Sequence, residues 1–498
     1  MLETVLGSTE AAKESLIYSY GRSFNGFAAM LSGEEVDKCS DMEGVISVIP
    51  NIALKLYTTR SWDDIRLTES YVRRSSSRGG NVIIGMFDTG IWPESDSFND
   101  EGLEPPPRKW KGKCQQAPEN FTCNNKIIGT RYYNLLGIGD GSQGDTTGHG
   151  TITASIAAGR EVQGASYYGL TKGVARGGAP SARLAVYKVC WPNFGCYAAN
   201  ILAAFDDAIA DGVDIISISF GDYINQDYFK DTIGLGSFHA MRKGILTIAG
   251  AGNSGPSRAL LCNSAPWMVT VAASSVDRKF ISRLVLGNGE AIVYTRWRFV
   301  LYLKSFNLMN AASVMDPKKD ENENEFAYGS GLINPVKAVD PGLVFNASEA
   351  DYIDFLCKQG YSKTNSPRTI TNDSSVCKST NYGRAWDLNY PSFSLAIEDG
   401  HKIEGKFIRT VTNVGSPNST YVAISNMPKY IKVDVNPSVL AFSAIGEEKS
   451  FTVKVSGPPI IQVPIISGSI TWKHEKHEVR TPLVVYTVLP AALKEKIF

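Results

Sequence analysis

A histidine flanked by two glycines lies in the stretch Asp145–Gly159, which reads DTTGHGTITASIAAG. After Thr151 the stretch holds only Ile, Thr, Ala and Ser, which is typical of a helix packed closely against its neighbours. His149 would begin this helix, where the helix dipole favours the neutral ring that accepts a proton. The glycines would let another group approach the ring. We predict a general base here; the alternative is a turn with an ordinary histidine.

Two other stretches supply the groups that such a base needs. The apolar run Asn81–Asp88 is typical of a strand buried on both faces of a parallel sheet, and Asp88 at its carboxyl end could orient a histidine. A second apolar run, 245–249, leads into GAGNSGP, where Asn253 could direct its amide NH2 at an oxyanion. The alternatives are a capping or turn aspartate and a plain turn asparagine.

In the order of the chain, with Asp88 first, then His149 and then Asn253, the three stretches resemble the subtilisin-like serine proteases, which run Asp, His, Ser. Further blocks make the chain similar to the cucumisin-like subtilases of plants: TTRSWD (58–63), DTGIWPES (88–95), CNNKIIG (123–129), GGAPSAR (177–183) and PWMVTVAA (266–273). The resemblance implies an endopeptidase that cleaves polypeptides. In it Asp88 would orient His149, His149 would act as general base and then acid, and Asn253 would hold the oxyanion. This chemistry needs no metal and no other cofactor.

Two glycine-containing segments accompany these residues. By resemblance they form the walls of the primary specificity pocket: Ser219-Phe220-Gly221 and Gly250-Ala251-Gly252. Their backbone would pair with an extended substrate as an added strand; the alternative is that the glycines only end strands. Ile152 replaces the second histidine of the family's GHGTHTAS motif, and we expect it to face into the helix packing.

The serine nucleophile of the family has no counterpart in this sequence. Beyond Gly289 the family continues with an inserted protease-associated domain and a Gly-Thr-Ser-Met segment whose serine opens a buried helix. This chain contains no Gly-Thr-Ser, and residues 290–310 match nothing in the family. Ser313 is the nearest serine, but it matches the region after that helix and follows no glycine.

We therefore predict that the chain does not cleave peptide bonds by covalent catalysis, and that it is poorly soluble because a buried helix is missing. Two alternatives accompany this prediction. The chain is a non-catalytic homologue that acts by binding or inhibition, or it is an incomplete gene model of an active enzyme.

Strands and helices alternate over residues 58–289, which predicts an α/β fold with a subtilisin-like parallel sheet and helices on both faces. The helices are expected at Ala198–Asp211, stopped by Gly212, and at Thr232–Lys243. Strands are expected over 183–189, 213–219 and 245–249. Short alternating strands between 386 and 490, beginning with Tyr390–Phe393, indicate a β-sandwich that resembles a fibronectin type III-like domain. Its histidines, at 401, 474 and 477, are expected on the surface rather than in a metal site.

Residues 1–57 resemble the inhibitory propeptide of subtilases, a small α+β domain, so the chain's own propeptide would be a partner. A strand is expected over 19–29, a capping box of Ser32 and Glu35 opens a helix to about Cys39, and another strand follows over 45–49. Processing would occur between Tyr57 and Thr58. We thus predict a truncated inhibitor-type propeptide (1–57), a peptidase domain deleted internally after about 289 (58–340), a connecting segment (341–385) and a fibronectin type III-like domain (386–498).

Composition excludes several kinds of partner. Lys+Arg and Asp+Glu are 50 each, so nothing indicates nucleic acid or an anionic membrane surface. No apolar run approaches the roughly 18–20 residues of a membrane span. The first twenty residues lack the basic and apolar regions of a signal peptide.

Cysteines and glycosylation sequons nevertheless point to secretion, to the apoplast or cell wall by family. Six of the eight cysteines pair by spacing as disulfides: Cys114 with Cys123, Cys190 with Cys196, and Cys357 with Cys377. Sequons begin at Asn120, Asn346, Asn372 and Asn418. Either the true N-terminus lies upstream, or the chain is a truncated product.

Overall fold

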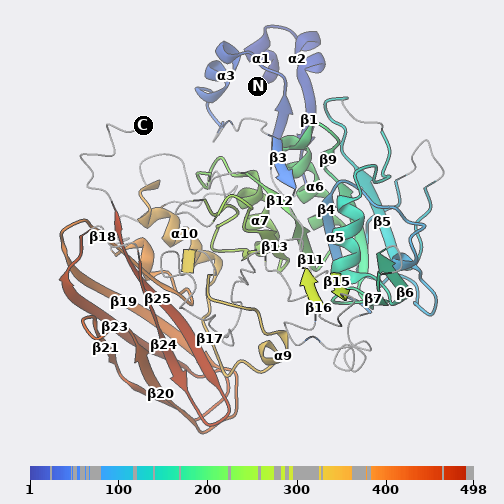
Figure 1. Cartoon of the computed structure of the whole chain (residues 1–498). Coiled ribbons are helices and arrows are strands. Elements are labelled where there is room, and N and C mark those ends of the chain that lie inside the picture. Colours follow the sequence, from blue (N-terminus) through green and yellow to red (C-terminus); the bar gives the residue numbers. More distant parts are fainter. Residues whose placement is uncertain are drawn as a thin grey trace.

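Three parts follow one another in the computed structural model (Figure 1): a small N-terminal unit, a central α/β body and a C-terminal β-sandwich. The structure describes residues 1–22, 25–45, 48, 53–56, 62, 67, 80–115, 121–137, 141–167, 170–222, 226–255, 260–273, 282–285, 291–294, 325–326, 329–361, 377, 383–461 and 465–488. The strand expected over 45–49, the processing site, Ser313 and the sequons at Asn120 and Asn372 lie wholly or largely outside these residues.

The N-terminal unit combines three short helices with a hairpin. Its elements are α1 (Leu2–Leu6), α2 (Thr9–Ser15), β1 (Leu16–Tyr20), β2 (Gly26–Ala29), α3 (Gly33–Ser40) and β3 (Ala53–Leu56). The backbone N–H of Ser32 donates to Glu35 Oε2 at 2.7 Å, which closes the start of α3. The single strand expected over 19–29 was wrong: β1 and β2 pair antiparallel, with Tyr20 opposite Gly26, because the glycines at 21 and 26 flank a chain reversal.

A six-stranded parallel sheet forms the centre of the body, in the order β14-β13-β11-β4-β8-β5. Its strands are β4 (Ile83–Asp88), β5 (Ile127–Tyr132), β8 (Arg183–Lys188), β11 (Ile215–Ile218), β13 (Leu246–Gly250) and β14 (Val269–Val271). Three helices pack on it: α5 (His149–Ala158), α6 (Ala198–Asp211) and α7 (Thr232–Arg242). The expected α/β architecture is confirmed.

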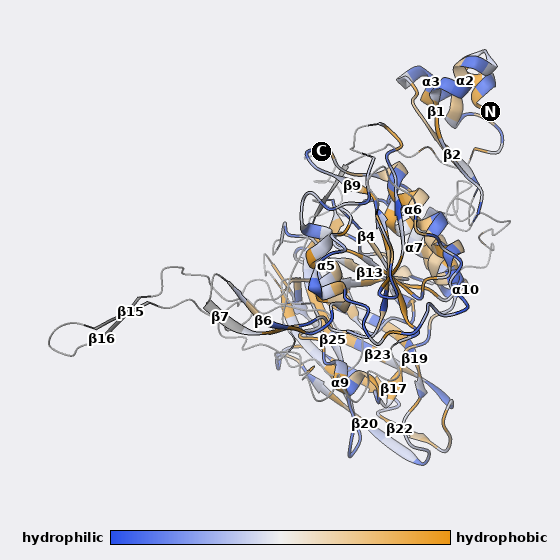
Figure 2. Ribbon diagram, turned by 90° about the vertical axis from the view of Figure 1, so that its right-hand side faces the viewer, coloured by the Kyte–Doolittle hydropathy of each residue, from blue (hydrophilic) through white to orange (hydrophobic). Residues whose placement is uncertain are grey.

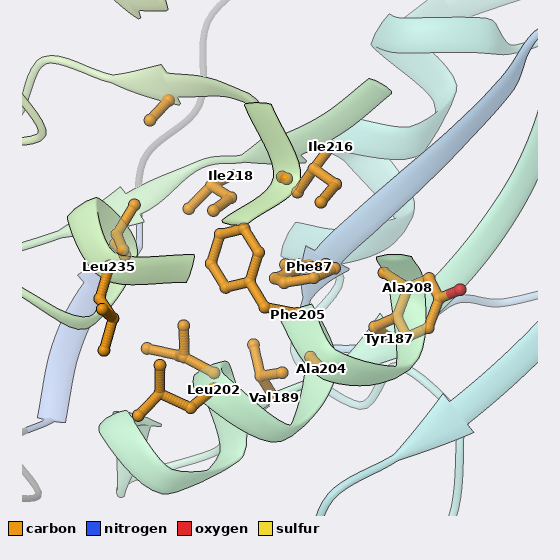
Figure 3. Packing of buried hydrophobic residues seen from close by; sticks show 14 of the residues in the cluster. Phe87, Tyr187, Val189, Leu202, Ala204, Phe205, Ala208, Ile216, Ile218 and Leu235 are labelled. Carbon is orange, nitrogen blue, oxygen red and sulfur yellow. The ribbon is translucent and has the colours of Figure 1, made fainter. Parts of the chain in front are cut away.

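Two apolar cores lie on opposite faces of this sheet, because successive strand residues point to opposite sides. Phe87 belongs to the larger core, where its ring lies 4.9 Å from that of Phe205 on α6 (Figure 3). Ile84 and Met86 belong to the smaller core, with Ala154 of α5. Side chains of β4 at even positions therefore face α5, and Asp88 shares that parity.

Other short elements lie outside this sheet. Among the described residues, no helix has the length and apolar character of a membrane span. Figure 2 shows the apolar residues, in orange, along the central strands and α6. The shorter elements are η1 (Asp96–Phe98), β6 (Val162–Tyr167), β7 (Leu170–Ala175), β9 (Cys190–Trp191), β10 (Gly195–Tyr197), β12 (Phe220–Gly221), β15 (Ser282–Val285), β16 (Ala291–Tyr294), α9 (Pro335–Ala338), α10 (Glu349–Lys358) and η4 (Ala385–Asp387).

The C-terminal part is a sandwich of a four-stranded sheet, β17-β19-β23-β21, and a five-stranded sheet, β18-β25-β24-β20-β22. Leu343 of β17 is fully buried in its core, so the sandwich includes residues that the sequence assigned to the connecting segment. The strands are β17 (Leu343–Val344), β18 (Phe393–Glu398), β19 (Lys402–Asn413), β20 (Ser419–Asn426), β21 (Lys432–Asn436), β22 (Val439–Phe442), β23 (Glu448–Pro459), β24 (Ile466–Lys473) and β25 (Glu478–Val488).

Three local predictions were wrong. Ile152 does not face the packing of α5 but is 49% exposed. The side chain of His477 is only 10% exposed, and its Nε2 lies 3.1 Å from Asp340 Oδ1, so it is not a surface residue. Residues 390–392 precede β18 instead of belonging to a strand, since the proline at 391 cannot donate to a sheet ladder.

Among the described residues, no three His, Cys, Asp or Glu side chains form a metal-binding group.

Candidate active site

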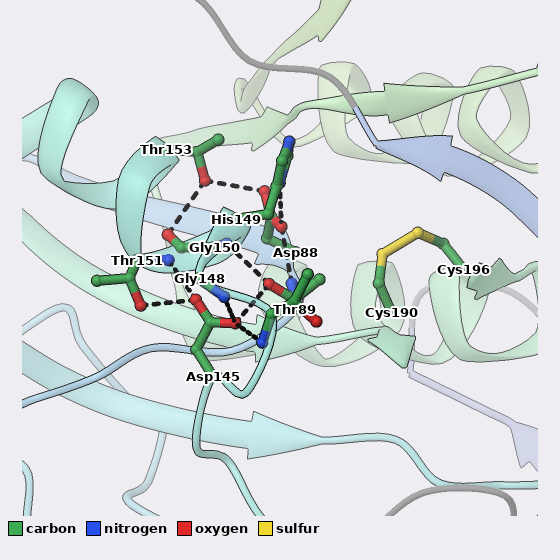
Figure 4. Close-up of polar contacts among 11 residues, drawn as sticks. Asp88, Thr89, Asp145, Gly148, His149, Gly150, Thr151, Thr153, Cys190 and Cys196 are labelled. Atoms are coloured by element: carbon green, nitrogen blue, oxygen red, sulfur yellow. Dashed lines mark hydrogen bonds and ion pairs between the residues drawn. A yellow bond between two sulfur atoms is a disulfide. The ribbon is translucent and has the colours of Figure 1, made fainter. Parts of the chain in front are cut away.

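Asp88 and His149 meet at the rim of the sheet on the α5 side (Figure 4). Asp88 ends β4 and is 1% exposed, and His149 is the first residue of α5, entered through Gly148 at φ 84°. His149 Nδ1 lies 2.7 Å from Asp88 Oδ1. The strand parity and the helix start thus bring the two predicted residues into direct contact.

Both carboxylate oxygens of Asp88 have further partners. The backbone N–H of Thr89 donates to Oδ1 at 2.8 Å, and the hydroxyl of Thr153, one turn into α5, donates to Oδ2 at 2.8 Å. These bonds fix the plane of the carboxylate and through it the orientation of the imidazole of His149, which leaves Nε2 as the nitrogen opposite the aspartate. Thr153 was not singled out in the sequence, although its i+4 spacing from His149 places the two on one helix face.

A second carboxylate, Asp145, ties the start of α5 to the loop after β4. Asp145 accepts the backbone N–H groups of Gly148 and Thr151 at 2.8 Å each, and the hydroxyl of Thr89 at 2.8 Å. That hydroxyl in turn accepts the N–H of Gly150 at 2.8 Å. Burial by itself raises the pKa of Asp145, but the hydrogen bonds from Thr151, Thr89 and Gly148 outweigh it and lower the pKa below its usual value. The charged form of Asp145 therefore holds the two segments that carry Asp88 and His149.

Gly150 is the point where these two segments touch, and we expect Gly150→Ala to lower the free energy of unfolding by about 3 kcal/mol. A Cβ at position 150 would lie 2.2 Å from the carbonyl oxygen of Gly90, so α5 and the loop must separate. Urea unfolding measures the change. Ile152→Ala, at an exposed position of the same helix, is the control and should cost no more than about 0.5–1 kcal/mol. Equal losses for the two variants would contradict the close approach.

The other predicted residues follow neighbouring strands of the sheet. The order β13-β11-β4 places Gly250, Ser219 and Asp88 at or just beyond the carboxyl ends of three adjacent strands, and therefore on one rim. Asn253 lies exposed three residues after β13. The buried side-chain NH2 of Asn263 donates to the carbonyl oxygens of Phe220, at 3.0 Å, and of Gly250, at 2.7 Å. Asn263 joins the two predicted pocket walls, a role that local sequence did not indicate.

An extended strand of the N-terminal unit lies between two short strands of the body, β12 and β10. β3 pairs antiparallel with β12, Leu56 opposite Phe220 and Lys55 opposite Gly221. On its other side β3 pairs antiparallel with β10, Leu54 opposite Cys196. The segment at 219–221 thus flanks an extended chain. The segment at 250–252 does not pair with this strand: Gly250 ends β13, and Ala251 donates to Val271 at 2.8 Å.

The structure joins the six cysteines in three disulfides: Cys114–Cys123, Cys190–Cys196 and Cys357–Cys377. Cys39 and Cys262 are buried and lie outside them. The Cys190–Cys196 bond connects β9 to β10, the strand that borders β3. Of the described sequons, both Asn346 and Asn418 are exposed.

Comparison with known proteins agrees with this arrangement. The Subtilase family profile matches residues 79–425, Peptidase inhibitor I9 matches 1–57 and the Fibronectin type-III domain matches 387–485. The chain belongs to the subtilase family. By family, this subtilase is a serine-type endopeptidase, a hydrolase, with an I9 unit at its N-terminus and a fibronectin type-III sandwich at its C-terminus.

Plant subtilases resemble it over its whole length. Subtilisin-like protease SBT4.3 of Arabidopsis thaliana is 34% identical over 689 residues, which cover 98% of this chain and 93% of the relative. SBT4.9 of the same plant is 35% identical over 665 residues, covering 98% and 91%. Because 98% of 498 residues is about 488, about 200 of the 689 aligned positions have no counterpart in this subtilase.

Proposed function

We propose that this chain is a subtilase with an assembled peptide-binding cleft and a preformed Asp88–His149 dyad, but without a nucleophile to complete the triad. The 2.7 Å contact between His149 Nδ1 and Asp88 Oδ1 carries the proposal. In that arrangement Asp88 stabilises the imidazolium, and Nε2 of His149 takes a proton from a nucleophile and returns it to the leaving amine. Asn253, on the same rim, would donate to the oxyanion.

The cleft supports polypeptides as the ligand class. Its two borders, β12 and β10, already hold the extended segment β3 by backbone pairing, and backbone pairing is how a sheet edge binds a peptide strand. Because β3 ends one residue before Tyr57, the segment fits the chain's own propeptide lying in the substrate cleft up to its processing site. Residues 1–57 would then act as the inhibitory partner of the peptidase domain that begins at Thr58.

Whether this cleft cleaves a bound peptide depends on the nucleophile, which is missing. A dyad activates a hydroxyl only within hydrogen-bond reach, about 2.6–3.2 Å. The sequence has no Gly-Thr-Ser, and about 200 positions of a relative have no counterpart in it. The chain in this form therefore binds peptides without cleaving them, as a non-catalytic homologue would, unless the segment is missing only from the gene model. Sequencing the transcript across residues 289–316 separates those two origins.

We expect a fluorophosphonate probe, which labels activated serines, to leave the purified chain unlabelled. The test uses the full chain and residues 58–498, because removal of the N-terminal unit opens the cleft. His149→Ala is the matched control, since any labelling that survives it does not depend on the dyad. Stoichiometric labelling of one serine that disappears with His149→Ala would overturn the proposal, and mass mapping would identify that serine.

We also propose that the protein acts outside the cell, in the apoplast or cell wall. Three disulfides fit an oxidising compartment. Asn418 is exposed and suits glycosylation, whereas the amide of Asn346 donates to the Thr412 hydroxyl at 2.8 Å. Glycosidase treatment of secreted protein, followed by mass mapping at these two asparagines, tests the assignment.

A further inference from the structure

A buried lysine lies beside the dyad, at the carboxyl end of β8. Lys188 is 0% exposed and is the cross-strand partner of Asp88 in the parallel pairing of β8 with β4. Paired residues of adjacent strands point to the same face of a sheet, so the side chain of Lys188 lies on the α5 side, as that of Asp88 does. Its neighbours Leu184 and Val186 agree with this, because both belong to the smaller core that α5 covers.

The side chain of Lys188 fills the space between two loops of the site. Its Nζ donates to the carbonyl oxygen of Gly144 at 2.6 Å and lies 4.2 Å from the centre of the Trp191 ring. A Cβ at position 90 would lie 3.1 Å from Lys188 Cδ, so the lysine stem packs directly against Gly90. Lys188 therefore connects the loop that follows Asp88 with the loop that precedes α5.

The charged groups around His149 come from three elements. Asp88 ends β4, Asp145 precedes α5, and Lys188 ends β8. Negative charge on the two carboxylates favours the imidazolium form of His149, and the ammonium group of Lys188 opposes it. The side chains of His149 and Asp88 are only 13% and 1% exposed, so water screens these charges little. Because a general base must be neutral to accept a proton, positive charge beside the dyad keeps the base available.

We propose that Lys188 is a positioning residue of the dyad, which holds the loop before α5 through Gly144 and keeps His149 neutral through its buried charge. The proposal rests on the function proposed above in one respect, that His149 is the base of a subtilase dyad. With Lys188 in place, the imidazole would stay neutral at a lower pH than the two carboxylates alone allow. The device does not involve the nucleophile, so a non-catalytic chain retains it.

The test follows the protonation of His149 by NMR in the full chain, grown with isotope-labelled histidine. The chain has five histidines, and His149→Ala identifies the signal of interest. We expect Lys188→Met to raise the midpoint of the His149 titration by about one pH unit, the effect of a charge roughly 10 Å away at an effective dielectric constant of about 20. The direction is upward because the loss of a positive charge makes protonation easier.

Two further variants separate charge from hydrogen bonding. Lys188→Gln removes the charge but keeps a donor for the Gly144 carbonyl, and it should raise the midpoint as Lys188→Met does. Lys188→Arg restores a positive charge and should return the midpoint to within about 0.3 pH unit of the wild type. Circular dichroism shows whether each variant folds, and Lys188→Gln carries the test if Lys188→Met does not fold.

Lys126→Met is the matched control, because Lys126 is also fully buried and donates to the carbonyl oxygens of Pro180 and Ala182, at 2.9 and 2.5 Å. It precedes β5 and so lies at the amino ends of the strands, opposite to the dyad, and its loss should leave the midpoint unchanged. An unchanged or lowered midpoint in the folded Lys188→Met or Lys188→Gln chain, or an equal rise in Lys126→Met, would overturn the proposal. Because the readout is proton binding, serine labelling by the fluorophosphonate would refute the proposed inactivity without affecting it.

Discussion

A chain in which the family's Gly-Thr-Ser-Met segment is restored between Gly289 and Asp316, together with the buried helix that its serine opens, should hydrolyse peptides, and Asp88→Asn in that chain should lower kcat by about 10⁴. Asp88 is the acceptor for His149 Nδ1 and is fixed by Thr89 and Thr153. An asparagine in its place offers an N–H or a weaker acceptor, so the imidazole adopts the wrong tautomer and Nε2 no longer accepts the serine proton. Steady-state kinetics on a peptide substrate measure the loss.

Thr153→Val is the graded control for this experiment. It removes one hydrogen bond to Asp88 Oδ2 and leaves the carboxylate, so we expect a loss in kcat of about tenfold, the equivalent of about 1.4 kcal/mol. Alanine at the restored serine supplies the background rate. If Asp88→Asn kept kcat within tenfold of the restored chain, Asp88 would not orient the general base, and the site assignment would fail.

A buried lysine makes stability depend on pH. Lys126, just before β5, is fully buried and donates to the carbonyl oxygens of Pro180 and Ala182 at 2.9 and 2.5 Å. Burial, and secondarily the charges of Arg160 and Arg183, lowers its pKa to about 7. We expect the free energy of unfolding to rise by about 3 kcal/mol between pH 7 and pH 9.5.

The direction follows from proton binding in the two states. In the unfolded chain Lys126 has a pKa of about 10.4, so between pH 7 and that value the unfolded state binds more protons than the folded state, and raising the pH stabilises the fold. Below pH 7 both states are protonated and the folded state holds a buried charge. Above about pH 10 the buried hydroxyls of Tyr133 and Tyr187, whose pKa values are raised mainly by burial, act in the opposite direction.

Lys126→Met isolates this effect because it keeps the apolar stem and removes the ammonium group. Urea unfolding at pH 7 and pH 9.5 should show a smaller increase in stability for the variant than for the wild type. The variant leaves two carbonyl groups without their donor, so its absolute stability at pH 9.5 should be lower. Parallel pH dependence in the two proteins would mean that Lys126 stays charged in the fold.

Most strands and helices of the central α/β body could be predicted from the sequence, because short local patterns mark where they begin and end. Apolar runs identified β4 and β13, and Gly212, which adopts φ 85°, ended α6 where expected. The position of Ile152 could not be predicted, because the small residues of α5 are similar on all sides and show no buried face. The position of His477 is set by its contact with Asp340, and β3 forms by pairing with strands more than 130 residues away. No local sequence pattern could predict either contact.

The place of Asp88 and His149 was predictable because each is the terminal residue of an element with a strong signal. The supporting residues were harder. Asp145 and Thr153 act through hydrogen bonds whose partners come from folding α5 against the loop after β4. Asn263 bridges two strand ends, so its function exists only once β11 and β13 are adjacent. The ion pair of Arg22 with Asp207 joins residues 185 positions apart, so it forms only when the β1–β2 hairpin packs on α6 and no local pattern predicts it.

The pairing of β3 between β12 and β10 has a consequence for the molecule after its N-terminal unit has left. The sheet β12-β3-β10-β9 then loses its second strand, and two short edges with unpaired backbone groups face each other across an empty gap. Such edges recruit any extended chain within reach, including the exposed strands of a neighbouring copy. Loss of the unit would therefore expose this subtilase to self-association, and a bound peptide would protect it by filling the same gap.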